Sequence, residues 1–473
     1  MKIAFLEYSL LYESLGFANL MGVLKANDYD FKLFVISEEK DLIKSLKDYK
    51  PDLICLTACT GPHPMSFKIA QFIKKNMKSI ILLGGPHPTI FPEECIKEDC
   101  IDMICRGEGE DAFLELVQSL EQKKDYTKIQ NLWIKKEGKV YRNEIRPLRQ
   151  DLDSLPFPDK SEYFKYEIIR DLPLKRFITG YGCPYACSFC HNPIFVQLYK
   201  GKYMRKKSVE KVINEIEMIR RVCPPFRIHF HDDHFNFNKE WLKEFCKRFR
   251  EQVWLPWSCT VRVDILDEKT VEMMADAGCV GITTGLETHD EGYRNKILNK
   301  FLKNKDFEKA GELCKIYGIR HTTSIMLNLP GEDTEDIIKT IKFCRKIGIS
   351  HIRASVYSVI AKQSIVPWLI SNGYMEKEPE IDNFKEKDIS DITIQSREKD
   401  QIIRMSTFIN IMFKYPFTIP IVKFLCKFPI DKFGRGRLYD GYLESKFMGL
   451  SLWQAIKYYL RVNKGMKAYQ GLR

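Results

Sequence analysis

Three cysteines lie close together in one short segment of the chain. Residues 182–192 read GCPYACSFCHN, which gives Cys183, Cys187 and Cys190 the spacing C-x3-C-x2-C. One short loop with this spacing can surround a cubic iron–sulfur cluster with three thiolates. The fourth iron then has no protein ligand nearby in sequence. An open metal position of this kind can bind a substrate, as an open catalytic zinc site does.

A four-ligand zinc site and a closed ferredoxin-type cluster are the alternatives. Each needs a fourth ligand, but the next cysteine, Cys223, lies beyond a predicted helix at 208–222 and has no paired partner. His191 adjoins Cys190 and is too near in sequence to turn back toward the same metal. We therefore predict that Cys183, Cys187 and Cys190 are the metal ligands and catalytic residues of an open iron–sulfur site.

A second polar cluster follows a predicted strand at 227–231. His229, His231 and Asp233 alternate along the chain, so they point to one face of an extended strand. With His234 they could hold a separate metal, but no matching ligand set occurs elsewhere, and a polar active-site floor is favoured. Asp232 and Asp233 could also be an acid–base pair, although hydrogen bonding to substrate or cofactor is the favoured interpretation.

Short apolar runs predict two parallel sheets. The first five strands are expected at 2–6, 31–36, 52–57, 79–84 and 102–105, separated by helical segments such as 16–25 and 66–76. This alternation predicts a doubly wound α/β sheet, which binds ligands at the carboxyl ends of its strands. Turns rich in glycine and proline follow three of these strands, at 60–64, 84–89 and 106–110, where glycine lets a ligand approach the backbone.

Six further strands are expected at 177–180, 227–231, 257–261, 281–284, 322–327 and 351–356, with helices at 208–222, 239–251 and 334–347. This pattern predicts a full or partial parallel barrel with its catalytic groups at the carboxyl ends of the strands. The predicted organisation is a Rossmann-like domain at 1–150, a proline-marked linker at 151–172, a partial (β/α)6 barrel at 173–370 and a mostly helical region at 371–473.

Composition narrows the class of protein. The 473 residues are 44% hydrophobic and 29% charged, as in globular domains. The sequence shows no secretory signal pattern and no apolar run long enough to span a membrane. Fifteen cysteines in such a chain indicate a reducing cytoplasm rather than a disulfide scaffold. We therefore expect a cytoplasmic protein.

The net charge of +12 is concentrated at one end of the chain. Residues 401–473 contain 13 Lys or Arg, 3 Asp or Glu and 14 aromatic residues. Basic and aromatic residues together suit a membrane surface or a lipid-like or anionic substrate. Nucleic acid is a less favoured partner, and a solvated basic cap over the barrel is the plain alternative. Membrane association through this region is therefore an expectation to be tested.

The cysteine loop resembles the signature of radical S-adenosylmethionine (radical SAM) enzymes, C-x3-C-x-aromatic-C, with Phe189 as the aromatic residue. Further segments resemble the family's strand-end motifs: HDDHF at 231–235, RVD at 262–264, AGC at 277–279, GLET at 285–288 and LNLPGE at 327–332. Asn328 occupies a position where the family usually has glycine. The resemblance implies a [4Fe-4S] cluster and S-adenosylmethionine (SAM), with SAM contacted by Phe189, Asp233, Arg262 and Glu287.

The first domain resembles the cobalamin-binding domain of one large branch of this family. The matching segments are KPD at 50–52, GGPHPT at 84–89, RGEGE at 106–110 and DLDSLPFP at 151–158. The resemblance implies a cobalamin site that includes Thr57, Gly84, Gly85, Pro86, Gly107 and Glu108. The D-x-H-x-x-G motif that supplies a histidine ligand to cobalt is absent, so cobalamin is expected to bind without one.

Members of this branch cleave SAM reductively to a 5′-deoxyadenosyl radical that attacks an unactivated carbon. The resemblance implies C-methylation of a small-molecule or lipid-like metabolite, with a flavodoxin- or ferredoxin-type electron donor. Oxidative cyclisation or rearrangement by the same architecture is the alternative within the family. The predicted helical tail argues against the tRNA methylthiotransferases. A cobalamin or iron–sulfur sensor or electron carrier without turnover is the alternative of a different class.

Overall fold

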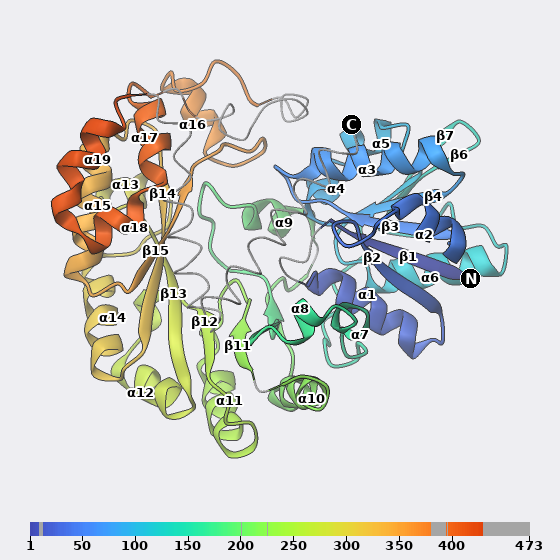
Figure 1. Ribbon diagram of the computed structural model, residues 1–473, viewed down its shortest axis with the longest axis horizontal. Helices are drawn as coiled ribbons and strands as arrows, with labels where there is room; N and C mark the ends of the chain where they lie inside the picture. Colours follow the sequence, from blue (N-terminus) through green and yellow to red (C-terminus); the bar gives the residue numbers. More distant parts are fainter. Residues whose placement is uncertain (9–12, 200, 225, 380–393, 395, 429–473) are drawn as a thin grey trace. The chain divides into compact units, whose positions relative to one another are not determined.

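The computed structural model describes the chain except residues 9–12, 200, 225, 380–393, 395 and 429–473 (Figure 1). It divides into two compact units. The first contains Met1–Leu172 and Phe195–Tyr203, and the second contains Pro173–Ile194 and the described chain from Met204 onward. Among the described residues, no helix is both long enough and apolar enough to cross a bilayer.

The first unit is built on a seven-stranded sheet in the order β2-β1-β3-β4-β5-β6-β7. Its strands are β1 (Lys2–Glu7), β2 (Asp30–Val35), β3 (Leu53–Thr57), β4 (Ile80–Gly84), β5 (Met103–Cys105), β6 (Leu132–Lys136) and β7 (Lys139–Arg142). The first five are parallel, which confirms the predicted doubly wound sheet. Their order places a topological switch point between β1 and β3, where such sheets bind ligands.

The antiparallel pair β6–β7 was not predicted. Lysines on both strands hide the alternation of apolar and polar residues. The turn between them contains Glu137 and Gly138, both with positive φ, as a two-residue hairpin requires. The feature that could have indicated this hairpin is the pair Glu137–Gly138 between two short segments rich in lysine and arginine.

Helices cover both faces of this sheet and make two separate cores. They are α1 (Leu15–Ala26), α2 (Leu42–Tyr49), α3 (His63–Asn76), α4 (Pro86–Ile90), α5 (Pro92–Lys97) and α6 (Glu110–Glu121). Ile3 and Phe5 of β1 face the core that α1 and α6 close, and Ala4 and Leu6 face the core of α2 and α3. This alternation is the period of two expected for a strand buried on both faces.

The segment 151–172 contributes to the first core. It contains the short helices α7 (Ser161–Phe164) and α8 (Glu167–Arg170). Tyr163 is completely buried, accepts a hydrogen bond from the Ser14 amide and donates one to the Glu7 carboxylate. Tyr163 thus connects Glu7 at the end of β1 with Ser14 at the start of α1.

The second unit contains a six-stranded parallel sheet in the order β15-β14-β13-β12-β11-β8. Its strands are β8 (Leu174–Phe177), β11 (Arg227–Phe230), β12 (Trp257–Thr260), β13 (Cys279–Glu287), β14 (Arg320–Leu327) and β15 (His351–Val356). β8 and β15 are edges that do not pair with each other, so the sheet is the predicted partial barrel.

Helices cover the outer face of the curved sheet (Figure 1). They include α10 (Val209–Arg220), α11 (Lys239–Gln252), α12 (Glu268–Asp276), α13 (Glu291–Lys296), α14 (Asn304–Ile316) and α15 (Thr334–Lys346), with a single 3-10 turn, η1 (Val263–Ile265). Beyond the barrel the described chain is helical, as predicted: α16 (Val366–Ser371), α17 (Lys399–Ser406), α18 (Ile409–Lys414), η4 (Pro416–Thr418) and α19 (Ile419–Leu425).

The first barrel strand differs from the prediction. Its pairing with β11 ends at Phe177, and Gly180–Tyr181 (β9) instead pairs with Arg205–Lys206 (β10) in a small antiparallel sheet. A Cβ at Gly180 would lie 2.5 Å from the Arg205 carbonyl oxygen, so only glycine fits there. The cysteine loop therefore leaves from this small sheet and leads into α9 (Asn192–Leu198), rather than leaving the barrel directly.

Candidate functional site

The three cysteines line one cavity at the carboxyl ends of the barrel strands. The cavity has a volume of about 350 Å³, and its wall also includes Phe189, Asp233, Arg262 and Glu287. These are the four residues that the resemblance assigned to SAM. The structure therefore brings the predicted cluster ligands and the predicted SAM contacts together, although they come from the cysteine loop and from three strand ends.

The three thiols line one wall of the cavity. This arrangement fits an iron–sulfur cluster, in which each cysteine binds a different iron. Burial raises the pKa of Cys183 to about 11 and also raises the pKa values of Cys187 and Cys190, so the thiols need a metal to become thiolates at neutral pH.

Ser188, in the middle of the loop, holds the cysteines in place. Its amide donates to the Leu298 carbonyl at 3.0 Å, and its hydroxyl donates to the Ile297 carbonyl at 2.7 Å. On its other side, the Ser188 carbonyl accepts from the Ile365 amide at 3.2 Å. The loop is thus fixed between two segments more than a hundred residues away, which the cysteine spacing alone could not indicate.

Glu287 ends β13 with its carboxylate directed at the cavity. It is 7% exposed, and its Oε1 lies 2.6 Å from the ammonium of Lys300. Its φ of +64° is in the left-handed region, so the strand turns sharply at this residue. Lys300 was not predicted as a site residue. It also lies 5.8 Å from the centre of the Phe189 ring, so this ion pair joins the cysteine loop to β13.

The guanidinium of Arg262 is occupied by partners within the chain. It is bound by the Asp264 carboxylate at 3.0 Å, and it donates to the carbonyls of Lys300 and Phe301 at 2.8 and 3.2 Å. The same group stacks on the ring of Tyr185 at 3.6 Å. Arg262 therefore holds the backbone at Lys300 in place. It also contacts the cysteine loop through Tyr185, which lies between Cys183 and Cys187.

The two aspartates after β11 have different surroundings. Asp232 is 3% exposed, accepts a hydrogen bond from the Thr179 amide at 2.7 Å and pairs with Lys206 at 3.1 Å. Asp233 instead lines the cavity, where Asn192 donates to it at 3.3 Å. Burial, and to a lesser degree the neighbouring Asp232, raises the pKa of Asp233. Asp232 therefore fixes the strand end, and Asp233 remains for a ligand.

Two arginines that sequence reasoning missed lie near the barrel histidines. Burial, the charge of His231 and then the charges of Arg353 and Arg176 lower the pKa of His229 to about 3. Arg353 belongs to β15 and also lines the cavity. Three strands separate β15 from β11, yet Arg353 lies near enough to His229 for its charge to lower the pKa of that imidazole.

The structure shows why asparagine can occupy position 328, where the family usually has glycine. Its φ is +61°, a conformation that asparagine tolerates better than other non-glycine residues. The side chain is completely buried, donates to the Ile394 carbonyl at 3.2 Å and accepts from the Ser396 hydroxyl at 2.6 Å. Asparagine thus keeps the backbone turn and adds an anchor for the chain after α16.

We expect Asn328→Ala to destabilise the protein by about 1–3 kcal/mol, because both hydrogen bonds are lost and alanine is strained at this φ. Asn328→Gly should lower the free energy of unfolding by less, because glycine loses the two hydrogen bonds but adopts this positive φ without strain. Urea unfolding of the three proteins measures this order. An alanine variant as stable as the wild type would refute the anchoring role.

The predicted cobalamin residues lie in the loops that follow β3, β4 and β5. Thr57 and Gly84 pair in register at the ends of β3 and β4. Gly85 has a φ of +100°, and a Cβ there would lie 2.7 Å from the Thr57 hydroxyl and 2.8 Å from the Ala58 carbonyl. Pro86, the next residue, is exposed at the first position of α4.

The loop after β5 is tied to the loop after β4. The Gly107 amide donates to the Thr89 hydroxyl at 2.9 Å, and that hydroxyl donates to the Gly85 carbonyl at 2.8 Å. Asn131 holds the Glu108 carbonyl at 2.6 Å. These contacts hold the loops after β4 and β5 together at the carboxyl edge of the sheet, and we call the backbone around Gly85 and Gly107 the cradle.

Neither histidine of the first 172 residues is presented at this edge. His63 and His87 are both completely buried and stack on each other with ring centres 3.8 Å apart. Burial lowers the pKa of His87 to about 2, with a smaller contribution from His63, so its ring stays neutral. The arrangement agrees with the expectation that a corrin would bind here without a histidine ligand to cobalt.

Each of the two units matches a known protein family. Residues 177–344 match the model of the radical SAM superfamily, and residues 1–117 match that of the B12 binding domain. An uncharacterized methyltransferase of Pyrococcus horikoshii is 29% identical over 370 residues, which cover 76% of this chain and 79% of the relative. An anaerobic magnesium-protoporphyrin IX monomethyl ester cyclase of Rubrivivax gelatinosus is 27% identical over 387 residues, which cover 78% of this chain and 66% of the relative.

The fold is also similar to a solved structure. The cobalamin-dependent S-adenosylmethionine radical enzyme OxsB, with aqua-cobalamin bound, matches with a TM-score of 0.70 and 16% identity, over 99% of this chain and 80% of that one. This likeness concerns the arrangement of the strands and helices. It agrees with the doubly wound sheet and partial barrel described above.

Proposed function

The chain belongs to the cobalamin-dependent radical SAM enzymes, and we propose that it transfers a methyl group to an unactivated carbon of a small-molecule or lipid-like substrate. The observation that supports SAM cleavage at this site is the shared cavity, which the three cysteines line together with Glu287, Asp233 and Arg353. The relative from P. horikoshii, named as a methyltransferase, supports methyl transfer over other outcomes.

The cofactors of this enzyme are a [4Fe-4S] cluster, SAM and cobalamin. When bound, the cluster and cobalamin supply the electron that splits SAM and the methyl group that is transferred. We propose that Cys183, Cys187 and Cys190 hold the cluster and that the cradle around Gly85 and Gly107 holds cobalamin. A flavodoxin- or ferredoxin-type protein is the proposed electron donor.

The chain's own residues position the reactants and exclude water. Ser188 fixes the cysteine loop, and Arg262 fixes the backbone at Lys300. The Lys300–Glu287 pair gives the cavity one positive and one negative group, which matches the carboxylate and ammonium groups of an amino acid. Leu302 and Phe307 form an apolar part of the wall, and Arg353 supplies a positive charge for an anionic group of the substrate.

Oxidative cyclisation is the second candidate reaction. It is favoured by one specific observation, the relative from R. gelatinosus that is named as a cyclase. Both reactions use the same cluster and SAM site, so the geometry around the cysteines does not separate them. They differ in what happens to the substrate carbon after hydrogen is removed.

Product analysis of the reduced enzyme separates these reactions. Protein reconstituted without oxygen and supplied with dithionite, SAM and cobalamin should form 5′-deoxyadenosine. A methyltransferase should also form S-adenosylhomocysteine, whereas a cyclase should not. Absence of 5′-deoxyadenosine would favour a sensor or electron carrier without turnover and would contradict the proposal.

We expect Gly85→Ala to weaken cobalamin binding by about tenfold to a hundredfold. A Cβ at this φ is strained and collides with the β3 end, so the loop must move. Retention of the cobalamin absorption band after gel filtration measures the effect. Gly138→Ala is the matched control, because Gly138 also has positive φ but no atom within 4 Å of its Cβ position. Equal loss of cobalamin from both variants would contradict the proposed cobalamin site around Gly85 and Gly107.

A further inference from the structure

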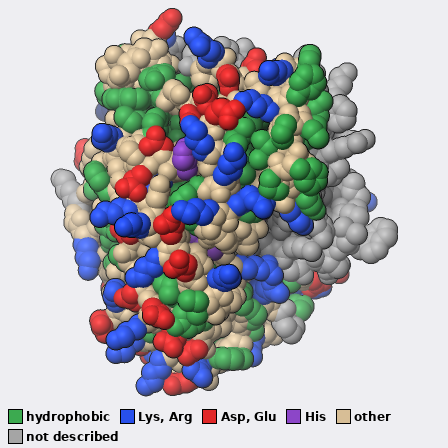
Figure 2. Space-filling view, turned by 90° about the vertical axis from the view of Figure 1, so that its left-hand side faces the viewer, with side chains coloured by type: hydrophobic (Ala, Val, Ile, Leu, Met, Phe, Trp, Pro, Cys, Tyr) green, Lys and Arg blue, Asp and Glu red, His purple; other side chains and the backbone are tan. Residues whose placement is uncertain are grey.

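Large hydrophobic side chains are exposed together on η4, on α19 and just beyond them. Phe417, Ile421, Phe424 and Phe428 are 74%, 58%, 60% and 51% exposed, and we call these four the C-terminal apolar face. Ile421 and Phe424, three residues apart, lie on one side of α19, and Phe417 and Phe428 lie in the segments before and after this helix. Figure 2 looks onto this side of the second unit, and hydrophobic side chains gather toward the top of the view with Lys and Arg beside them.

The rest of the fold holds this face outward. Val422 and Cys426, on the opposite side of the helix, are 6% and 0% exposed. Gln401 of α17 donates to the Lys423 carbonyl at 3.0 Å, and Arg404 donates to the Cys426 carbonyl at 3.1 Å. Ile421 and Phe424 are therefore presented by a helix that hydrogen bonds attach to α17.

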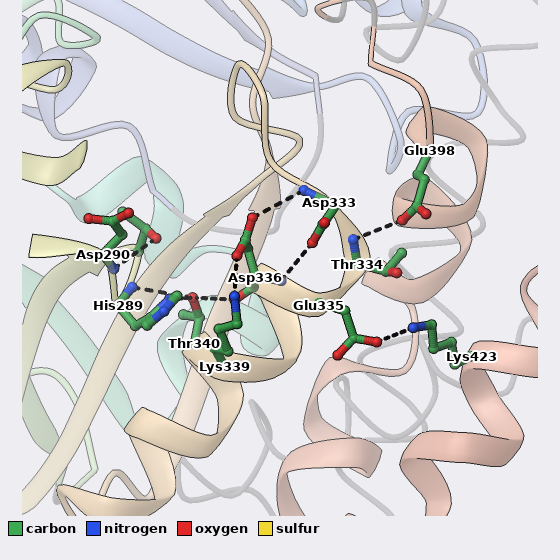
Figure 3. A network of polar contacts seen from close by, with 11 residues as sticks. His289, Asp290, Asp333, Thr334, Glu335, Asp336, Lys339, Thr340, Glu398 and Lys423 are labelled. Atoms are coloured by element: carbon green, nitrogen blue, oxygen red, sulfur yellow. Dashed lines mark hydrogen bonds and ion pairs between the residues drawn. The ribbon is translucent and has the colours of Figure 1, made fainter. Parts of the chain in front are cut away.

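An ion pair attaches α19 to the barrel as well. Figure 3 shows Lys423 of α19 reaching Glu335 near the start of α15, while Glu398, just before α17, accepts a hydrogen bond from the Thr334 amide at 2.9 Å. These contacts use the polar side of α17 and α19 within the protein. They leave the opposite, apolar side facing away from the barrel.

The segment that carries the face is basic, and one of its lysines, Lys423, pairs with Glu335 of α15. From residue 401 to residue 428 the sequence contains four Lys or Arg and no Asp or Glu. Lys414 lies 5.6 Å from the ring of Tyr415, next to the face, and Lys427 lies beside Phe428. The sequence from 401 to 473 carries 13 basic and 3 acidic residues in all.

We propose that the C-terminal apolar face docks on an anionic lipid bilayer. Aromatic and aliphatic side chains can enter the headgroup region of a bilayer, and basic residues at the rim attract anionic lipid. Pro416 and Pro420 limit α19 to a short helix, which suits shallow insertion and not a long helix-in-groove contact. With so small a face, binding should need both the apolar and the basic residues and should be reversible and weakened by salt.

Flotation of the full chain with vesicles tests this proposal. The wild type should float with vesicles of phosphatidylcholine and phosphatidylglycerol at low salt, but not with phosphatidylcholine alone or at high salt. Phe417→Ser/Phe424→Ser should reduce the bound fraction by about tenfold. Trp254→Ser is the matched control, because it removes an aromatic side chain that is 63% exposed far from this face in the sequence.

A second variant, Lys414→Gln/Lys427→Gln, should weaken binding to phosphatidylglycerol vesicles while leaving the apolar face unchanged. All variants should form 5′-deoxyadenosine in solution as the wild type does, so failure here is separate from failure of the proposed reaction. The proposal is overturned if the wild type does not float, or if the Phe417→Ser/Phe424→Ser protein floats equally well. It is also overturned if the face instead holds two copies together, seen as a dimer that this variant converts to monomer.

Discussion

Replacing Cys183, Cys187 or Cys190 with alanine should each reduce 5′-deoxyadenosine formation to background. In the proposed site each thiol supplies one of three protein bonds to the cluster, and no other described cysteine lines the cavity to replace it. The fold should persist, because all three side chains are only partly buried and the loop is held by Ser188. Iron content and 5′-deoxyadenosine yield after anaerobic reconstitution measure the effect.

Cys223→Ala is the control for these variants. Cys223 is also partly buried, but it follows α10 and does not line the cavity. It should bind a full complement of iron and retain activity. Full activity in any of the three loop variants would contradict the assignment of the cluster ligands.

Gly285→Ala should lower the affinity for SAM by about tenfold to a hundredfold while leaving the fold intact. A Cβ at Gly285 would lie 2.4 Å from both Glu287 Oε1 and Lys300 Nζ. These atoms are the ends of flexible side chains, so the ion pair would be displaced and the backbone would not. Equilibrium dialysis with SAM and thermal unfolding measure the two effects separately.

Gly281→Ala tests whether the effect comes from the ion pair. Gly281 is on the same strand and, four residues earlier, on the same face, but its nearest neighbour would be 3.6 Å from an added Cβ, an ordinary contact. SAM binding should be unchanged in this variant. If Gly285→Ala binds SAM as well as Gly281→Ala, the Lys300–Glu287 pair does not contribute to the SAM site.

Local sequence patterns predicted most of the framework. Short apolar runs identified the five parallel strands of the first unit and the six strands of the barrel, because most of these strands are largely buried. The cysteine spacing also predicted where the loop lies. The β8 end was predicted wrongly, since whether Gly180 continues the barrel or pairs with β10 depends on a contact with Arg205 that lies 25 residues further on.

The parts of the site that were missed depend on distant contacts. Nothing in the local sequence marks Ser188, because its role depends on hydrogen bonds to Ile297 and Leu298, more than a hundred residues away. Lys300 follows no strand and belongs to no motif, yet it pairs with Glu287. Arg353 was not singled out, because its approach to the barrel histidines arises only when the sheet curves. Motifs therefore indicated the cysteine loop, and tertiary packing defined the cavity that the loop lines.

The most direct test of this account is the electron paramagnetic resonance spectrum of the anaerobically reconstituted, reduced protein, recorded with and without SAM. An iron with an open position predicts the spectrum of a reduced [4Fe-4S] cluster that changes on addition of SAM. A spectrum that SAM leaves unchanged, or protein that contains zinc in place of iron, would contradict the proposed site.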